Sequence, residues 1–241
     1  MPKETPPRSI VKLFTSDLSG VGTPRHGSHS VSRKIPDSTV RRLGLYLHTL
    51  EELSRGGGET VSSEDLAGRA GTTAAQVRKD LSHFGSFGKR GLGYAVPELA
   101  DELREILGVD RSWRVALVGA GRIGSALFEY DGFHARGFDI VAVVDSDPEK
   151  VGQLWGDVRI RDSADLEAVL REEAIDIAIL AVPAQAAQGV LAGTLAAGIR
   201  GILNFTPAQL RVPEGVALKD VNLVLELESL SFSLSHRSPG R

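Results

Sequence analysis

Three glycines with the spacing of a dinucleotide-binding loop occur in the segment Gly119-Ala120-Gly121-Arg122-Ile123-Gly124. An apolar run, residues 113–118, precedes this loop and a helical pattern follows it. In such a loop the first glycine permits a tight turn, the second lets the backbone approach a pyrophosphate, and the third lets the helix pack closely on the strand. The helix N-terminus also offers backbone N–H groups to the anion. We therefore expect all six loop residues to contribute to a cofactor site.

A carboxylate stands where a dinucleotide site needs one. Chance alone gives roughly 0.3 matches to the glycine pattern in a chain with 27 Gly among 241 residues, so the context decides. A predicted strand over residues 138–144 ends in Asp145, 21 residues beyond Gly124. A carboxylate there accepts hydrogen bonds from the adenosine ribose and repels a 2′-phosphate, which predicts NADH and NAD+ rather than the phosphorylated cofactors. Asp147 reinforces the repulsion, although it is at least as well explained as a turn residue.

The elements that position this site alternate between strands and helices. Further strands are predicted over 158–160, 175–182 and 201–205, and helices over 164–172 and 186–197. This alternation, with continuous apolar strands, indicates an α/β fold with a parallel, doubly wound (Rossmann) sheet. Because ligands of such sheets lie beyond the carboxyl ends of the strands, we expect cofactor contacts from two strand ends. The residues at these ends are Val182, Pro183, Asn204 and Phe205.

The basic residues gather in one N-terminal segment, although the whole chain carries a net charge of −3. Between Arg33 and Val96 there are ten Lys or Arg against seven Asp or Glu, a net +3, so the rest of the chain carries −6. A localised basic surplus is typical of a nucleic-acid-binding module.

The same segment has the pattern of a winged helix-turn-helix. Apolar residues at helical spacing predict a first helix that begins after Pro36 and ends at Gly56-Gly57-Gly58. A second helix is predicted between an N-cap at Ser62 and a C-cap at Gly71, and a third helix follows an N-cap at Thr72 or Thr73. Two short helices at a glycine-containing turn form a helix-turn-helix. Residues 84–94 then mix aromatic and basic residues with turn-permitting glycines, which favours a two-stranded wing.

The third helix and the wing tip supply the expected DNA contacts. These are Thr73, Gln76, Arg78, Lys79 and Ser82 on the helix, with Lys89 and Arg90 on the wing. The alternative is a three-helix core whose cations are solvated; the positions of Arg78, Lys79, Lys89 and Arg90 argue against it.

Composition and the flanking segments complete the organisation. With no cysteine, thiolate metal sites and a disulfide-stapled secreted design are excluded, and without a long apolar stretch or an apolar leader we expect a cytoplasmic protein that does not bind membranes. We predict a disordered tail over 1–32, a DNA-binding domain over 33–108, a Rossmann domain over 112–220, and a strand and leucine-rich helix over 221–236. The leucine stripe of the last segment suits docking on a second subunit.

The order of modules resembles the Rex family of redox-sensing transcriptional repressors. The residues that carry the resemblance are 76–85 with 88–94, the loop 119–124, Asp145, and 201–207, and it spans roughly residues 35–234.

The resemblance implies a homodimer that exchanges its C-terminal helices and binds double-stranded operator DNA. It also implies that NADH binding closes the dimer and releases the DNA, and that Tyr94 lies at the domain interface near the cofactor. The chain departs from some members at the start of the last element, where Asn222 and Leu223 replace an acidic and an aromatic residue. This departure affects the expected nicotinamide contacts.

Two alternatives share the glycine loop. An NAD-dependent dehydrogenase needs a substrate domain and an acid-base residue, yet only about 36 residues follow Phe205, and the candidates His134 and Lys219 are better explained as surface residues. A coenzyme A-binding module does not explain Asp145. We therefore expect a repressor with no catalytic residue and no metal site, which binds NADH and NAD+ without consuming them.

Overall fold

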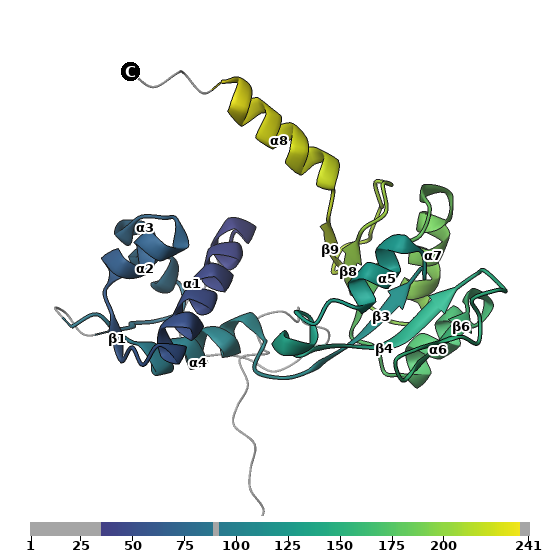
Figure 1. The fold of residues 1–241 in the computed structure, drawn as a ribbon, viewed down its shortest axis with the longest axis horizontal. Coiled ribbons are helices and arrows are strands. Elements are labelled where there is room, and N and C mark those ends of the chain that lie inside the picture. Colours follow the sequence, from purple (N-terminus) through teal and green to yellow (C-terminus); the bar gives the residue numbers. More distant parts are fainter. Residues whose placement is uncertain (1–34, 89–91, 237–241) are drawn as a thin grey trace, which may run out of the picture. The chain divides into compact units, whose positions relative to one another are not determined.

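The computed structural model describes residues 35–88 and 92–236, whose elements are labelled in Figure 1. The chain divides into two compact units, with the division between Leu103 and Arg104. The division falls inside one helix, α4, whereas the sequence pattern changes at residues 108–112. No helix among the described residues has the length and apolar character needed to cross a membrane.

The N-terminal unit is a small helical domain with one two-stranded ribbon. Its elements are α1 (Asp37–Arg55), β1 (Thr60–Val61), α2 (Ser63–Ala70), α3 (Ala74–Leu81), β2 (Tyr94–Ala95) and the first part of α4 (Val96–Leu107). Leu43, Leu47, Leu50, Leu66, Val77 and Leu81 form its core and are almost fully buried. The helical stripes predicted from the sequence therefore face inward.

Capping residues set the boundaries of the helix-turn-helix as predicted. The Ser62 hydroxyl accepts a hydrogen bond from the Asp65 N–H, and the Thr73 hydroxyl accepts one from the Gln76 N–H. Gly71 ends α2 in the left-handed region with φ 66°, which favours glycine. The predicted two-stranded wing over residues 84–94 differs from the structure: β2 pairs in an antiparallel ribbon with β1, which precedes α2, and residues 84–88 form no strand. The wing tip, residues 89–91, lies outside the described residues.

The C-terminal unit is a doubly wound α/β domain, as predicted. Its strands are β3 (Trp113–Val118), β4 (Phe138–Asp145), β5 (Leu154–Trp155), β6 (Val158–Asp162), β7 (Ile177–Leu180), β8 (Gly201–Asn204) and β9 (Ala217–Asp220). Its α-helices are α5 (Arg122–Phe128), α6 (Leu166–Glu172), α7 (Ala184–Ala196) and α8 (Leu223–Ser235), with 3₁₀ turns at His134–Arg136 and Ser163–Asp165. The strand order is β5-β6-β4-β3-β7-β8-β9, which places β3 and its glycine loop beside β7, where the order reverses.

Two strands differ from the sequence prediction. β5 is a two-residue edge strand antiparallel to β6, and so short a piece has no periodicity to recognise. The last strand, β9, ends at Asp220, before the segment in which the sequence placed it. In β9 the apolar Leu218 is followed by the charged Lys219, a pattern that is typical of a strand at the edge of a sheet. The apolar run after Val221, which suggested a strand, belongs to α8.

The two faces of the sheet are covered differently. Leu166, Leu170 and Leu191 of α6 and α7 pack on one face, over Val118, Val144 and Leu180. On the other face, α5 covers Leu117 and Val143. A cavity of about 350 Å³ lies against β3, β4, β7, β8 and β9, and Ile140, Ile177, Ile179 and Leu203 are among the residues that line it.

Candidate functional site

The glycine loop has the backbone that a phosphate cradle needs. Gly119 has φ 108°, and a Cβ there would lie 2.5 Å from the Ala181 carbonyl oxygen on the strand β7 side. A Cβ on Gly124 would overlap the Gly119 carbonyl oxygen. A Cβ on Gly121, by contrast, would meet no atom within 4 Å. The first and third glycines are therefore required by packing, and the second leaves open space in front of the loop. Arg122 and Ile123 follow as exposed residues of the first turn of α5.

Asp145 is held against this loop. One carboxylate oxygen accepts a hydrogen bond of 2.6 Å from the Ala120 N–H, and the other accepts one of 2.8 Å from the Asp147 N–H. The carboxylate thus organises the loop. A carboxylate oxygen has two lone pairs, so Oδ2, which accepts the Ala120 N–H, retains capacity for a hydroxyl donor.

Lys150 is a site residue that the sequence analysis missed. Its Nζ lies 3.2 Å from Asp147 Oδ2 and 3.6 Å from Asp145 Oδ1. The hydrogen bond to Asp147 raises the pKa of Lys150, while the Glu149 N–H and Lys150 lower the pKa of Asp147. The negative charges of Asp145 and Asp147 are therefore partly neutralised by the ammonium group of Lys150.

Of the predicted strand-end residues, Val182 lies beside the loop. Val182 approaches Gly119 closely, and Val182 and Phe205 are both half-buried, with Pro183 exposed at the start of α7. Asn204 is 1% exposed. Its amide nitrogen donates to Asp220 Oδ1 and the Ala208 carbonyl, and its amide oxygen accepts from the backbone N–H and the hydroxyl of Thr206. In this structure the Asn204 amide is fully hydrogen-bonded within the protein and holds the loop after β8, and the expected place of Asn204 in the cofactor site stays a prediction.

Tyr94 belongs to the N-terminal unit, where β2 pairs with β1. Its side chain is buried at 7% exposure and lies against Gly88, where any Cβ would overlap the ring. Burial raises the pKa of its hydroxyl. Its expected role near the cofactor stays a prediction.

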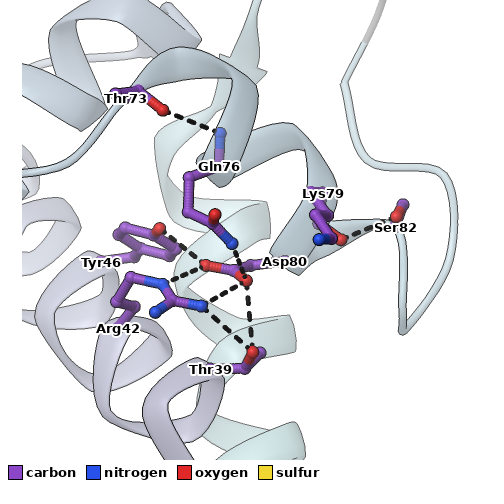
Figure 2. Close-up of polar contacts among 8 residues, drawn as sticks. All are labelled: Thr39, Arg42, Tyr46, Thr73, Gln76, Lys79, Asp80 and Ser82. Atoms are coloured by element: carbon purple, nitrogen blue, oxygen red, sulfur yellow. Dashed lines mark hydrogen bonds and ion pairs between the residues drawn. The ribbon is translucent and has the colours of Figure 1, made fainter. Parts of the chain in front are cut away.

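Among the predicted DNA contacts, four on or beside α3 are exposed, and one of them is Arg78. Lys79 and Ser82 are exposed, and the Ser82 hydroxyl donates to the Lys79 carbonyl at 2.7 Å (Figure 2). Thr73, the N-cap, is exposed as well. Lys89 and Arg90 lie outside the described residues.

Arg78 and Gln76 have protein partners that the sequence did not reveal. Arg78 Nη1 donates to the Ser63 hydroxyl at 2.7 Å and lies 3.4 Å from Glu64 Oε1, so it ties α3 to the N-terminus of α2. Gln76 Nε2 donates to Asp80 Oδ1 at 2.8 Å. Both side chains are at least partly exposed to solvent, but each is held by a hydrogen bond within the protein.

A buried polar cluster behind α3 is the second feature that sequence reasoning missed. Asp80 is 0% exposed and accepts hydrogen bonds from four side chains, those of Thr39, Arg42, Tyr46 and Gln76 (Figure 2). Arg42 binds it through two nitrogens, at 2.6 Å and 2.8 Å. The only signal in the sequence is an acidic residue next to Leu81 on the apolar side of a basic helix.

These partners keep the Asp80 carboxylate ionised. Burial by itself would raise the pKa of Asp80, but the hydrogen bonds from Arg42, Gln76 and Tyr46 outweigh it and hold the pKa below 3.8. The same bond to Asp80 raises the pKa of Arg42, and burial followed by that bond raises the pKa of Tyr46 to about 12. The cluster is therefore a charged, fully hydrogen-bonded junction between α1 and α3.

Asp80→Asn is expected to destabilise the chain by about 3 kcal/mol at neutral pH, because it leaves the partly buried Arg42 without a counter-charge. A carboxyl whose pKa is lower in the folded than in the unfolded chain stabilises the fold at pH values above its unfolded-state pKa. This stabilisation is lost as the pH falls through the folded-state pKa. The difference between wild type and variant should therefore shrink below pH 3.8. Urea unfolding at several pH values measures it, with exposed Glu59→Gln as the control; a difference that does not change with pH would contradict the assignment.

The C-terminal helix α8 exposes its apolar residues. Leu223, Leu227, Leu230 and Leu234 are 55–67% exposed, and Phe232 is 64% exposed. Asn222 caps the helix, since its amide oxygen accepts from the N–H groups of Val224 and Leu225. Asn222, which replaces the acidic residue of some Rex family members, is thus a helix cap in this structure.

Two family models match the chain. One, described as a CoA binding domain, matches residues 110–208, and one, described as a DNA-binding protein N-terminus, matches residues 34–82. Among curated relatives, the redox-sensing transcriptional repressor Rex of Carboxydothermus hydrogenoformans is 48% identical over 201 residues, 83% of this chain and 97% of that protein. Rex of Streptomyces coelicolor is 43% identical over 207 residues, 86% of this chain and 80% of that protein.

The chain is also similar to solved structures of RSP, a Rex-family repressor. The chain resembles RSP in complex with beta-NAD+ and operator DNA, with a TM-score of 0.80 and 37% identity over 83% of this chain and 93% of that one. It also resembles RSP in complex with beta-NADH, with a TM-score of 0.76 and 35% identity over 84% and 95%.

Proposed function

Because the chain belongs to the Rex family of redox-sensing transcriptional repressors, we propose that it binds operator DNA as a homodimer and is released when NADH binds. It is a transcriptional repressor and not an enzyme. The observation that supports the proposal is the presence of two candidate sites in one chain. One is a glycine loop with Asp145 held against it, and the other is a capped helix, α3, with Lys79 and Ser82 exposed.

In the Rossmann unit, the roles follow from the geometry of the loop. Residues 119–124 would bind the pyrophosphate in the open space in front of Gly121, and Asp145 would accept hydrogen bonds from the adenosine ribose. Val182, Pro183 and Phe205 would form the walls around the nicotinamide, with Asn204 holding the loop between them. A ribose carboxylate suits NADH and disfavours coenzyme A, whose adenosine ribose carries a phosphate, although the matched family model is described as a CoA binding domain.

In the N-terminal unit, α3 would enter the major groove. Lys79 would contact the phosphates, with Thr73 and Ser82 as hydroxyl donors and Gln76 toward a base edge. Arg78 would reach a phosphate by exchanging its bond to Ser63, or would support α2 from its present position. Lys89 and Arg90 are proposed as wing contacts on the sequence alone.

Lys79→Ala is expected to weaken operator binding about tenfold and to lower the slope of log affinity against log salt by about 1, because one phosphate contact and its counterion release are lost. NADH affinity should not change. Fluorescence anisotropy with a labelled duplex at several salt concentrations measures both quantities. Arg171→Ala, which removes an exposed cation from α6, is the control. Loss of DNA and NADH binding together would indicate misfolding, whereas an unchanged operator affinity and salt slope would contradict the assignment.

The proposed homodimer rests on two apolar surfaces of the Rossmann unit. The leucine stripe of α8 is exposed, and the cavity beside β7, β8 and β9 is lined almost entirely by apolar side chains. Exposed apolar surface of this extent marks an interaction site. We propose that α8 is exchanged and packs on the partner subunit, which brings two α3 helices onto one operator.

Replacing Leu227 and Leu230 by glutamate is expected to give a monomer, because the charges would have to be buried in an apolar interface. Operator affinity should then fall by about 100-fold, since binding of the second half-site is no longer intramolecular. Sedimentation velocity gives the mass and anisotropy the affinity. Glu226→Gln and Glu228→Gln on the same helix are the control. A double variant that stays dimeric would contradict the role of α8.

A further inference from the structure

The amide of Gln76 has only one possible orientation in this structure. Its nitrogen Nε2 lies 2.8 Å from Asp80 Oδ1 (Figure 2). An ionised carboxylate accepts hydrogen bonds and donates none, so the nitrogen and not the oxygen of the amide must face Asp80. The amide oxygen Oε1 is therefore directed away from Asp80.

Asp80 is itself fixed by α1. Thr39 Oγ1 donates to Oδ1 at 3.3 Å, Tyr46 donates to Oδ2 at 3.0 Å, and Arg42 spans both oxygens. The carboxylate is buried, and these partners hold its pKa low, so it is an acceptor throughout the neutral range. The orientation of Gln76 is thus imposed by the core of the domain.

Gln76 lies in the first turn of α3, and N-terminal residues of a recognition helix are those that contact base edges. In the major groove, an amide free to turn can pair with acceptors or donors, whereas a fixed amide oxygen can pair only with the exocyclic amino groups of adenine and cytosine. Facing O6 of guanine or O4 of thymine, it would be repelled.

We propose that Asp80 is a positioning residue that makes Gln76 a fixed hydrogen-bond acceptor, which reads one amino-bearing base, adenine or cytosine, in each half-site. The proposal rests on the proposed binding of operator DNA through α3. It assigns Asp80 a role in specificity, because the carboxylate sets which half of the Gln76 amide is presented.

The test uses the full chain and a duplex that the wild type selects from a randomised library. Affinities are measured for this duplex, for each single base-pair replacement, and for a duplex in which the candidate base is replaced by an analogue that lacks its exocyclic amino group. In the wild type, removing that amino group should cost about tenfold at one position. In Gln76→Met the cost should vanish. In Asp80→Asn it should fall below about threefold, because an asparagine amide can donate or accept and no longer imposes one orientation.

Thr39→Val is the matched control, since it removes another hydrogen bond from the same carboxylate without touching Gln76. It should lower stability and keep the discrimination. If Asp80→Asn weakens binding to all duplexes by the same factor, Asp80 is merely structural and the proposal is overturned. If Asp80→Asn does not fold, Gln76→Met decides, because undiminished discrimination in that variant overturns the proposal. Selection of no duplex by the wild type would instead overturn the proposed DNA binding.

Discussion

Saturating NADH is expected to weaken operator binding by this chain by about 10³- to 10⁴-fold, while NAD+ at the same concentration weakens it far less. A ligand shifts an equilibrium between two states only by its differential affinity for them. Converting a population that is 99:1 in favour of DNA binding into its reverse needs about 5.5 kcal/mol, which two cofactor sites in a dimer would share.

The difference between the two cofactor forms has an electrostatic origin. Oxidised nicotinamide carries a positive charge and reduced nicotinamide does not, and burying an unpaired charge among apolar walls is costly. The candidate walls, Val182 and Phe205, are apolar and half-buried in the isolated subunit. A closed state that buries the ring further would therefore favour NADH.

Anisotropy titrations on the duplex selected by the wild type measure this effect. NADPH and coenzyme A are the matched control ligands, because Asp145 should repel the phosphate that each carries on its adenosine ribose. Linkage also requires the duplex to weaken NADH binding by the factor by which NADH weakens DNA binding. Equal release by NADH and NAD+ would show that the chain does not sense redox state, and release by coenzyme A alone would favour the CoA-binding alternative.

Local chemistry made the framework predictable. Ser62, Thr73 and Gly71 act through their own side chain or φ angle within one turn of chain, so the sequence specifies them directly. The strand order and the place of Asp145 beside the glycine loop follow from alternating strands and helices, since crossover connections allow few arrangements. The helix caps and the doubly wound order of strands, which depend on nearest neighbours and on alternation, were therefore confirmed.

Contacts between distant segments could not be predicted in the same way. Asp80 lies 38 residues from Arg42 along the chain, and no periodicity indicates that the two meet. The same holds for Arg78 with Ser63 and for Asn204 with Asp220, both of which fill hydrogen bonds that the sequence analysis left for DNA or cofactor. A polar residue near a site can bind the ligand or hold the surrounding protein in place, and only its hydrogen-bond partners show which of the two it does.

Gly121→Val is expected to separate the two functions, giving a repressor that holds its operator and no longer responds to NADH. A Cβ at this position meets no protein atom within 4 Å, and the backbone has φ −82°, which any residue adopts. The fold should therefore be unaffected. The added side chain would instead fill the space in front of the loop and keep the pyrophosphate from the backbone N–H groups. NADH affinity should fall about 1000-fold, or ~4 kcal/mol, the worth of about two charge-assisted hydrogen bonds.

The control for Gly121→Val is Gly189→Val in α7, a glycine of the same unit that also has nothing within 4 Å of its Cβ position. It should bind NADH and release the operator like the wild type. Calorimetry with NADH and anisotropy with the duplex give both affinities for each variant. If Gly121→Val binds NADH normally, the pyrophosphate does not lie on this loop. If it loses NADH but is still released from DNA by it at the wild-type concentration, release does not proceed through this site, and the coupling must be sought elsewhere in the molecule.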